Sequence, residues 1–159
     1  TLRSTVSGAA RDFYLGQDTL GGIVFYLYWG DDGEQHGFVV SKTEAILPWQ
    51  YNASSLGTSS TIDGAANTIS MAGTPGATWV NSLGTGWYIP AAEELALLHQ
   101  HRYFANKGLI SGGNTPINLN QLYFSSTEQN ASWVYVLTRT GLTTSSKTGN
   151  QRFRAIKEF

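Results

Sequence analysis

The sequence predicts an α+β fold with an antiparallel sheet, because strand-like runs lie at both ends of the chain and helical segments lie between them. Residues 20–29 are rich in aromatic and β-branched side chains and predict a buried strand. A short acidic turn at 30–34 separates this run from a second one at 37–40. The two runs therefore predict an N-terminal hairpin.

The middle of the chain is expected to hold one main helix. The sequence Gly-Trp-Tyr-Ile-Pro at 86–90 precedes a helical pattern over about 91–105. Pro90 suits a first helical turn, where its missing N–H is not needed. Glu93 and Glu94 lie near the positive end of the helix dipole.

Two shorter helical segments are expected earlier, at 63–68 and 77–83, separated by the breaker Thr-Pro-Gly at 74–76. Asp63 is placed to cap the first of them. Gly108 is the expected stop of the main helix.

Three further strand-like runs follow, at 122–128, 131–138 and 151–159. In the second run, Trp133 and Tyr135 alternate with valines, which is typical of a strand with two different faces. Residues 140–150 are almost all Thr, Ser, Gly and Asn, and they are interpreted as a solvated loop. The C-terminal half is therefore expected to be rich in β-structure.

The composition points to one folded domain at 13–159 after a polar lead-in at 1–12. The chain has 159 residues, enough for a substantial core, and only 13% are charged. A net charge of −1 gives no electrostatic footprint for nucleic acid, and no apolar run is long enough to insert into a membrane. There are no cysteines, so disulfides and thiol chemistry are excluded. Because residue 1 is Thr, we expect a signal peptide or an upstream module to have been trimmed.

Several motifs, taken in order, resemble the Lcl C-terminal domain family. They are LGGIVFY at 20–26 with HGFVV at 36–40, GAANT at 64–68, GWYIP with EEL at 86–95, YFSSTE at 123–128 with ASW at 131–133, and RFRAI at 152–156. The resemblance covers about residues 13–159. Phe124 stands where the family more often has Trp.

The resemblance implies a C-type-lectin-like fold on a bacterial surface or phage-tail protein. Members of this family end collagen-like adhesins, and their wider relatives include the variable proteins of diversity-generating retroelements. In those variable proteins a C-terminal patch of side chains carries recognition. The family brings no catalytic residues to carry over.

The residues themselves give little sign of catalysis, and no cofactor is expected. The cysteine chemistry of the related formylglycine-generating enzymes is excluded here. His99 and His101 are two residues apart on a helix and point to different faces, so no metal site is predicted. A hydrolase is kept as an alternative, with Glu44, Glu93, Glu94 and Glu128 as its candidate carboxylates. Calcium binding at the acidic turn around Asp31 and Asp32 lacks regular ligand spacing and stays open.

The best candidate ligand site lies between 127 and 151, where aromatic, hydroxyl, amide and cationic side chains mix. Seven residues are predicted to bind ligand: Gln129, Asn130, Tyr135, Arg139, Thr144, Asn150 and Gln151. Trp133 is interpreted as core, Lys147 as an isolated cation, and Arg152 and Arg154 as anchors of the last strand.

The sequence thus predicts a non-catalytic, extracellular or cell-surface recognition domain. Its expected partner is a host or bacterial glycan or a surface protein. A structural alternative is a cap or trimerisation module that ends a fibre, which leaves homo-oligomerisation open.

Overall fold

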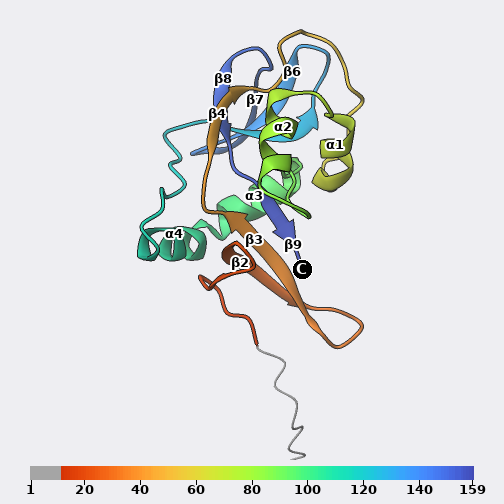
Figure 1. Ribbon diagram of the computed structural model, residues 1–159. Coiled ribbons are helices and arrows are strands. Elements are labelled where there is room, and N and C mark those ends of the chain that lie inside the picture. The colour runs from red at the N-terminus through yellow and green to blue at the C-terminus, as the bar shows by residue number, and fades with distance from the viewer. Residues whose placement is uncertain (1–11) are drawn as a thin grey trace, which may run out of the picture.

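The computed structural model describes residues 12–159, so the predicted lead-in lies outside the described residues except for Asp12. Over this range the fold is α+β, with four helices and two sheets (Figure 1). The four-stranded sheet has the order β1 (Asp18–Thr19), β2 (Gly22–Trp29), β3 (Gln35–Ser41) and β9 (Ile156–Glu158). The five-stranded sheet has the order β4 (Ala45–Pro48), β8 (Asn150–Phe153), β5 (Tyr123–Glu128), β6 (Trp133–Thr138) and β7 (Gly141–Ser146). The helices are α1 (Gly64–Ser70), α2 (Pro75–Ser82), α3 (Ala92–Gln100) and α4 (Arg102–Ser111).

The N-terminal hairpin is confirmed as β2 and β3, which pair in antiparallel register. The start of β2 is almost uniformly apolar because both of its faces are buried. Ile23 and Phe25 belong to a core cluster that includes residues of α3 and α4. Val24, between them, faces the second cluster together with residues of α2.

The two short helices are confirmed as α1 and α2, but α2 begins at Pro75, so Pro75 and Gly76 of the predicted breaker form its first turn. The Asp63 carboxylate accepts a hydrogen bond of 2.8 Å from the backbone N–H of Ala66, as expected of an N-cap. Thr74 caps α2 in the same way and accepts from the N–H of Ala77 at 3.2 Å. Both caps satisfy backbone donors that the first helical turn leaves without partners.

The prediction of one main helix over 91–105 is wrong, because the chain turns at His101 and forms α3 and α4 instead. His101 has φ −101° and ψ 11°, outside the helical region. At this break the Arg102 guanidinium donates to the carbonyl of His99 at 2.9 Å and so satisfies a free acceptor at the end of α3. Gly108 is not a stop, since α4 continues to Ser111.

The C-terminal segment differs from the prediction in two ways. The run 151–159 is not one strand: it divides at Arg154 and Ala155 into β8 and β9, which belong to different sheets. The expected loop at 140–150 contains β7, an edge strand whose small polar residues are compatible with little burial. The pairing of β5 with β8 is parallel, so the five-stranded sheet is mixed rather than purely antiparallel.

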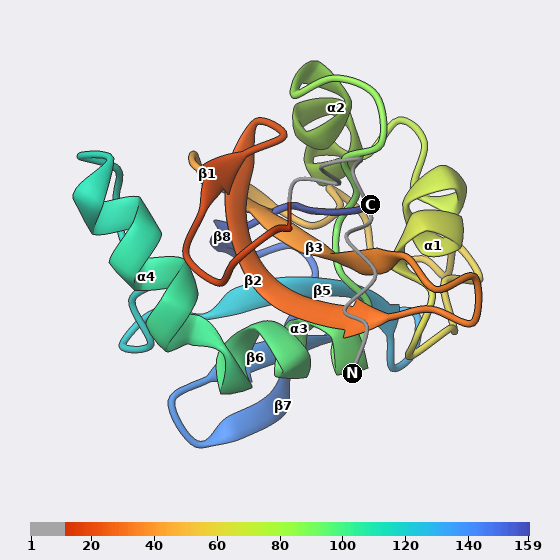
Figure 2. The same ribbon diagram turned by 90° about the horizontal axis from the view of Figure 1, so that it is seen from below.

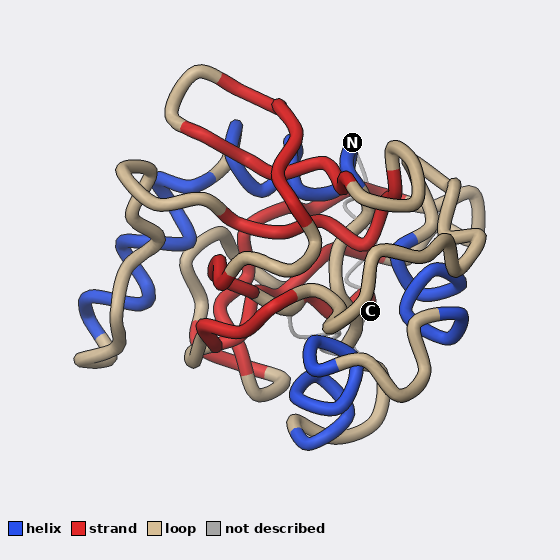
Figure 3. Tube along the Cα trace, turned by 90° about the horizontal axis from the view of Figure 1, so that it is seen from above, coloured by secondary structure: helices blue, strands red, loops and turns tan. Residues whose placement is uncertain are grey.

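The strands lie in the middle of the molecule and the helices at its periphery (Figure 3). Helices α3 and α4 lie on one side, and α1 and α2 lie on the other (Figure 2). The β6–β7 hairpin extends from this body as the far edge of the five-stranded sheet. The fold therefore presents one hairpin whose outer strand has no further neighbour in the sheet.

Candidate functional site

The β6–β7 hairpin carries an aromatic and hydroxyl-bearing face. Tyr135 lies opposite Thr144, and Trp133 lies opposite Ser146. Because side chains alternate across a strand, Trp133 and Tyr135 project from the same face of β6. Trp133 is 44% exposed, which is a large apolar surface to leave in water.

Helix α3 explains why this face becomes more exposed along β6. Leu137 is buried with Leu95 and Leu98 of α3, Tyr135 is half-buried, and Trp133 is exposed. The cover provided by α3 therefore ends between Tyr135 and Trp133. The interpretation of Trp133 as core is wrong, because its neighbours on the same face are covered and it is not.

The end of the hairpin next to Trp133 is fixed by a buried ion pair. The ammonium of Lys147 lies 2.5 Å from Oε1 of Glu128, and the Lys147 side chain has no exposed surface. Lys147 also donates to the carbonyl of Ser54 at 2.9 Å and lies 4.8 Å from the centre of the Trp49 ring. The description of Lys147 as an isolated cation is therefore wrong, because its ammonium is buried and paired with Glu128.

Glu128 hydrogen-bonds to the loop that precedes α1. Its carboxylate accepts from the backbone N–H groups of Leu56 at 2.7 Å and Gly57 at 3.0 Å, and from the Ser55 hydroxyl at 2.9 Å. Burial by itself raises the pKa of Glu128, but the hydrogen bonds from Lys147 and Leu56 outweigh it and leave the pKa below its ordinary value. The carboxylate stays ionised and holds the loop against the hairpin.

The seven predicted ligand residues are only partly brought together. Tyr135 and Thr144 are cross-strand partners. Gln129 and Asn130 lie in the turn before β6, while Arg139 lies in the turn after it, at the other end of the strand. The remaining two, Asn150 and Gln151, lie on β8, which β5 separates from β6.

Asn130 has a structural function in its turn. Its side-chain oxygen accepts from the N–H of Ser132 at 2.9 Å and from the N–H of Trp133 at 3.0 Å. This arrangement is typical of an Asx turn, and it sets where Trp133 enters β6. The predicted ligand residues do not include Trp133, which is exposed, or its half-buried partner Ser146, although the alternation in 131–138 places Trp133 on the same face as Tyr135.

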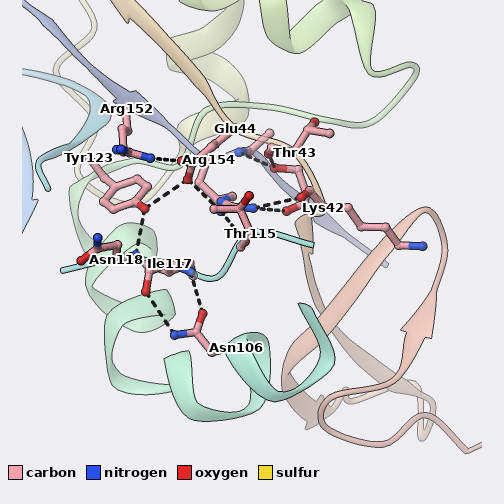
Figure 4. A network of polar contacts seen from close by, with 12 residues as sticks. Lys42, Thr43, Glu44, Asn106, Thr115, Ile117, Asn118, Tyr123, Arg152 and Arg154 are labelled. Carbon is pink, nitrogen blue, oxygen red and sulfur yellow. Dashed lines mark hydrogen bonds and ion pairs between the residues drawn. The ribbon is translucent and has the colours of Figure 1, made fainter. Parts of the chain in front are cut away.

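A second buried polar network joins the two sheets, and Figure 4 shows it around Glu44. Arg154 lies where the chain passes from β8 to β9, and its guanidinium contacts Glu44 at 2.7 Å. It also donates to the carbonyls of Ser41 at 3.0 Å and Thr115 at 2.9 Å. Arg152 forms an ion pair with the other oxygen of Glu44. Both arginines thus anchor the last strands, as their sequence position predicts.

The Tyr123 hydroxyl completes this network. It donates to Glu44 at 3.1 Å and accepts from the N–H of Asn118 at 3.0 Å. Burial raises the pKa of Tyr123, and the Glu44 carboxylate adds to the rise.

The other two candidate carboxylates also have structural partners. Glu94 accepts from the N–H groups of Ala91 at 2.8 Å and Gly64 at 3.0 Å and from the Tyr88 hydroxyl at 2.9 Å. Glu93 accepts from the Thr61 hydroxyl at 2.8 Å. Each of the four glutamates considered for a hydrolase therefore fixes one part of the chain to another.

Metal-ligand geometry is absent from residues 12–159, where no group of three or more His, Cys, Asp or Glu side chains is placed to hold an ion. In the acidic turn, Asp32 contacts His36 at 2.8 Å and accepts from the N–H of Glu34 at 2.9 Å. Within the same residues, no helix has the length and apolar character needed to cross a bilayer.

Comparison with known proteins reveals a similarity of fold. No protein-family model matches the sequence, and a search of curated proteins gives no significant match. A fimbrial protein from Bacteroides ovatus ATCC 8483, known from a crystal structure at 1.85 Å resolution, superposes with a TM-score of 0.68 at 17% sequence identity. The match covers 87% of this chain and 44% of the fimbrial protein, so the chain spans less than half of that protein's length.

Proposed function

We propose that this chain is a non-catalytic recognition domain of a bacterial surface or fimbria-like protein, with a C-type-lectin-like fold of the Lcl C-terminal type. The observation that carries the proposal is one face of the β6–β7 hairpin, where the exposed Trp133 and the half-buried Tyr135 lie opposite the half-buried Ser146 and Thr144. Rigid aromatic rings next to small hydroxyl groups supply contact area at low entropic cost and leave hydrogen bonds adaptable.

The anchoring of the hairpin supports this proposal. The Lys147–Glu128 pair and the Asn130 turn fix the end that presents Trp133. A surface held in place before the ligand arrives loses less conformational freedom on binding. The structural use of Glu44, Glu93, Glu94 and Glu128 supports a non-catalytic domain over a hydrolase.

The two ends of the described chain lie away from the hairpin (Figure 1). The rings of Phe13 and Phe159 lie 4.5 Å apart, and β9 pairs with β3, so both ends of the described chain lie side by side. The β6–β7 hairpin lies at the opposite end of the molecule (Figure 1). Attachment to a larger protein at Phe13 or Phe159 would leave the hairpin free to meet a glycan or a surface protein. The similarity to a fimbrial protein is compatible with such an arrangement.

The test compares three forms of the chain on a glycan array and on intact epithelial and bacterial cells, with and without calcium. Trp133→Ala/Tyr135→Ala removes the aromatic face, and Trp29→Ala is the matched control because Trp29 is also an exposed aromatic residue. We expect binding to be lost in the double variant and kept in the control, after circular dichroism has shown that both fold. Equal binding by all three forms would place the ligand site elsewhere. Concentration-dependent oligomerisation without binding would favour the fibre-cap alternative.

A further inference from the structure

A groove lies at the other edge of the five-stranded sheet, between the loop after β4 and the start of α2. It consists of two adjoining hollows of about 350 and about 230 Å³ that share Tyr51, Gly73 and Pro75. β4 and β7 form opposite edges of this sheet, and none of the residues that line the groove lies on β6 or β7. The larger hollow is within the range of small-molecule sites, which begins at about 300 Å³.

Two aromatic side chains line the larger hollow. Trp79 is half-buried, and its ring lies 6.4 Å from the core residue Phe153, which restrains it. Tyr51 is 74% exposed. Its ring can therefore supply contact area to a ligand bound beside Trp79.

Hydrogen-bonding groups without partners lie at the same place. Among the hydrogen bonds within residues 12–159, none uses the Tyr51 hydroxyl, the Trp79 indole N–H or the Asn52 side-chain amide. The Thr78 hydroxyl donates to the carbonyl of Thr74 at 2.9 Å and keeps its acceptor capacity. The groove therefore offers both donors and acceptors along its aromatic lining.

No ionisable acidic or basic side chain lines either hollow. A phosphate, sulfate or carboxylate group would lose its hydration there without gaining a cation. A neutral sugar ring fits these groups better, because one face is covered by C–H groups and its rim carries hydroxyls. Aromatic rings match the first feature, and the free amide, indole and phenol groups match the second.

We propose that this groove binds a neutral saccharide, with a pyranose ring against Tyr51 and Trp79 and its hydroxyls hydrogen-bonded to Asn52 and Thr78. The larger hollow, of about 350 Å³, has room for one or two sugar units. The groove and the hairpin face share no lining residue, so the two proposals can be tested separately.

The test is an NMR titration of the ¹⁵N-labelled chain with cellotetraose, chitotetraose and mannotetraose. A heparin-derived tetrasaccharide and a decaproline peptide serve as acidic and peptide comparisons. We expect at least one neutral tetrasaccharide to shift the Trp79 indole resonance in a saturable way. Tyr51→Ala should weaken this binding about tenfold or more. Tyr103→Ala, at an exposed tyrosine of α4, should leave it unchanged.

The variant Trp133→Ala/Tyr135→Ala separates the two proposals, since it should bind the tetrasaccharide as well as the unaltered chain does. Trp79→Phe keeps a smaller aromatic ring and removes the indole N–H, so it should weaken binding less than Tyr51→Ala, as followed by the backbone amide resonances. The absence of a saturable shift with every neutral tetrasaccharide would overturn the groove proposal. So would tighter binding of the acidic sugar or the peptide, or unchanged binding by Tyr51→Ala.

Discussion

Lys147 and Glu128 form an ion pair of 2.5 Å from which water is almost excluded, with side-chain exposures of 0% and 6%. Removing two charges from water is costly unless close geometry and further hydrogen bonds compensate. Here the carbonyl of Ser54 and the N–H groups of Leu56 and Gly57 supply those bonds. The pair therefore joins the loop at 54–57 to the end of the hairpin that carries Trp133.

Lys147→Met should destabilise the protein strongly, because it leaves the Glu128 carboxylate buried without its cation. Breaking a buried pair in this way typically costs about 3–5 kcal/mol. We expect a loss of about 3 kcal/mol in the free energy of unfolding, since backbone N–H groups still hydrogen-bond to the carboxylate. Urea denaturation at pH 7 measures it.

Lys42→Met is the matched control for Lys147→Met. Lys42 pairs with Asp18 at 2.6 Å, but the two side chains are 34% and 51% exposed. An exposed pair contributes at most about 1 kcal/mol. Equal losses in the two variants would contradict the assigned role of burial at Lys147.

The raised pKa of Glu94 should lower the free energy of unfolding as the pH rises. Burial raises its pKa, and the hydrogen bonds from Ala91 and Tyr88 only partly oppose this. The folded state therefore keeps a proton that the unfolded chain releases near pH 4.3, and stability falls as the pH rises between these two values. Glu94→Gln removes this dependence, so the variant should gain on the unaltered protein as the pH rises above about 4.3, measured by urea denaturation.

Glu128→Gln should show the opposite trend. The pKa of Glu128 is below its ordinary value, so its stabilisation is present above about pH 4.3 and is lost as the pH falls through the lower, folded-state value. The cost of this substitution should therefore shrink in acid. If both variants showed the same pH trend relative to the unaltered protein, the assignment of the two carboxylates would be wrong.

Local patterns predicted much of the fold. The apolar run that became β2, the cap at Asp63 and the alternation in β6 each determine structure over a few residues, which a sequence displays directly. The main helix was predicted as one element because nothing local marks His101 as a break. The turn at His101 involves tertiary contacts, and one of them is with Tyr26, whose ring centre lies 5.1 Å from that of His101. β7 was missed because an edge strand needs few apolar residues.

The candidate site was harder to predict because its key groups depend on distant partners. Lys147 lies among Ser, Thr and Gly, a context that indicates solvent, and only Glu128, 19 residues away, explains its burial. Arg154 was expected to anchor the last strand, but its partner Glu44 is 110 residues away. The exposure of Trp133 depends on how far α3 extends over β6, and no local pattern contains that information.

The histidines His36 and His99 should titrate on opposite sides of the ordinary value of about 6.5. The hydrogen bond that His36 donates to the Asp32 carboxylate raises the pKa of His36, and burial together with Arg102 lowers the pKa of His99. An NMR titration of the imidazole resonances measures both in one experiment. Asp32→Asn should lower the midpoint of His36 and leave that of His99 unchanged, and an unmoved His36 would contradict the pairing.

Gly108→Ala should destabilise the protein even though alanine favours helices over glycine by about 1 kcal/mol. An added Cβ at this position would lie 2.3 Å from Cγ2 of Ile23 and 2.6 Å from the carbonyl oxygen of Gly16. Inserting a methyl group into such a contact costs about 1–3 kcal/mol, and a backbone atom cannot rotate away as a side chain can. We expect a net loss of about 1–2 kcal/mol, measured by thermal unfolding.

Gly112→Ala tests whether the contact, rather than the loss of a glycine, is responsible. At Gly112 the added Cβ would come closest to the side-chain amide of Asn114, at 2.8 Å, and that flexible group can move. Its backbone φ of −86° suits alanine, so the change should stay within about 0.5 kcal/mol. If Gly108→Ala were as mild as Gly112→Ala, α4 would have room to move away from β2. The close approach of the two elements would then not be what requires glycine at position 108.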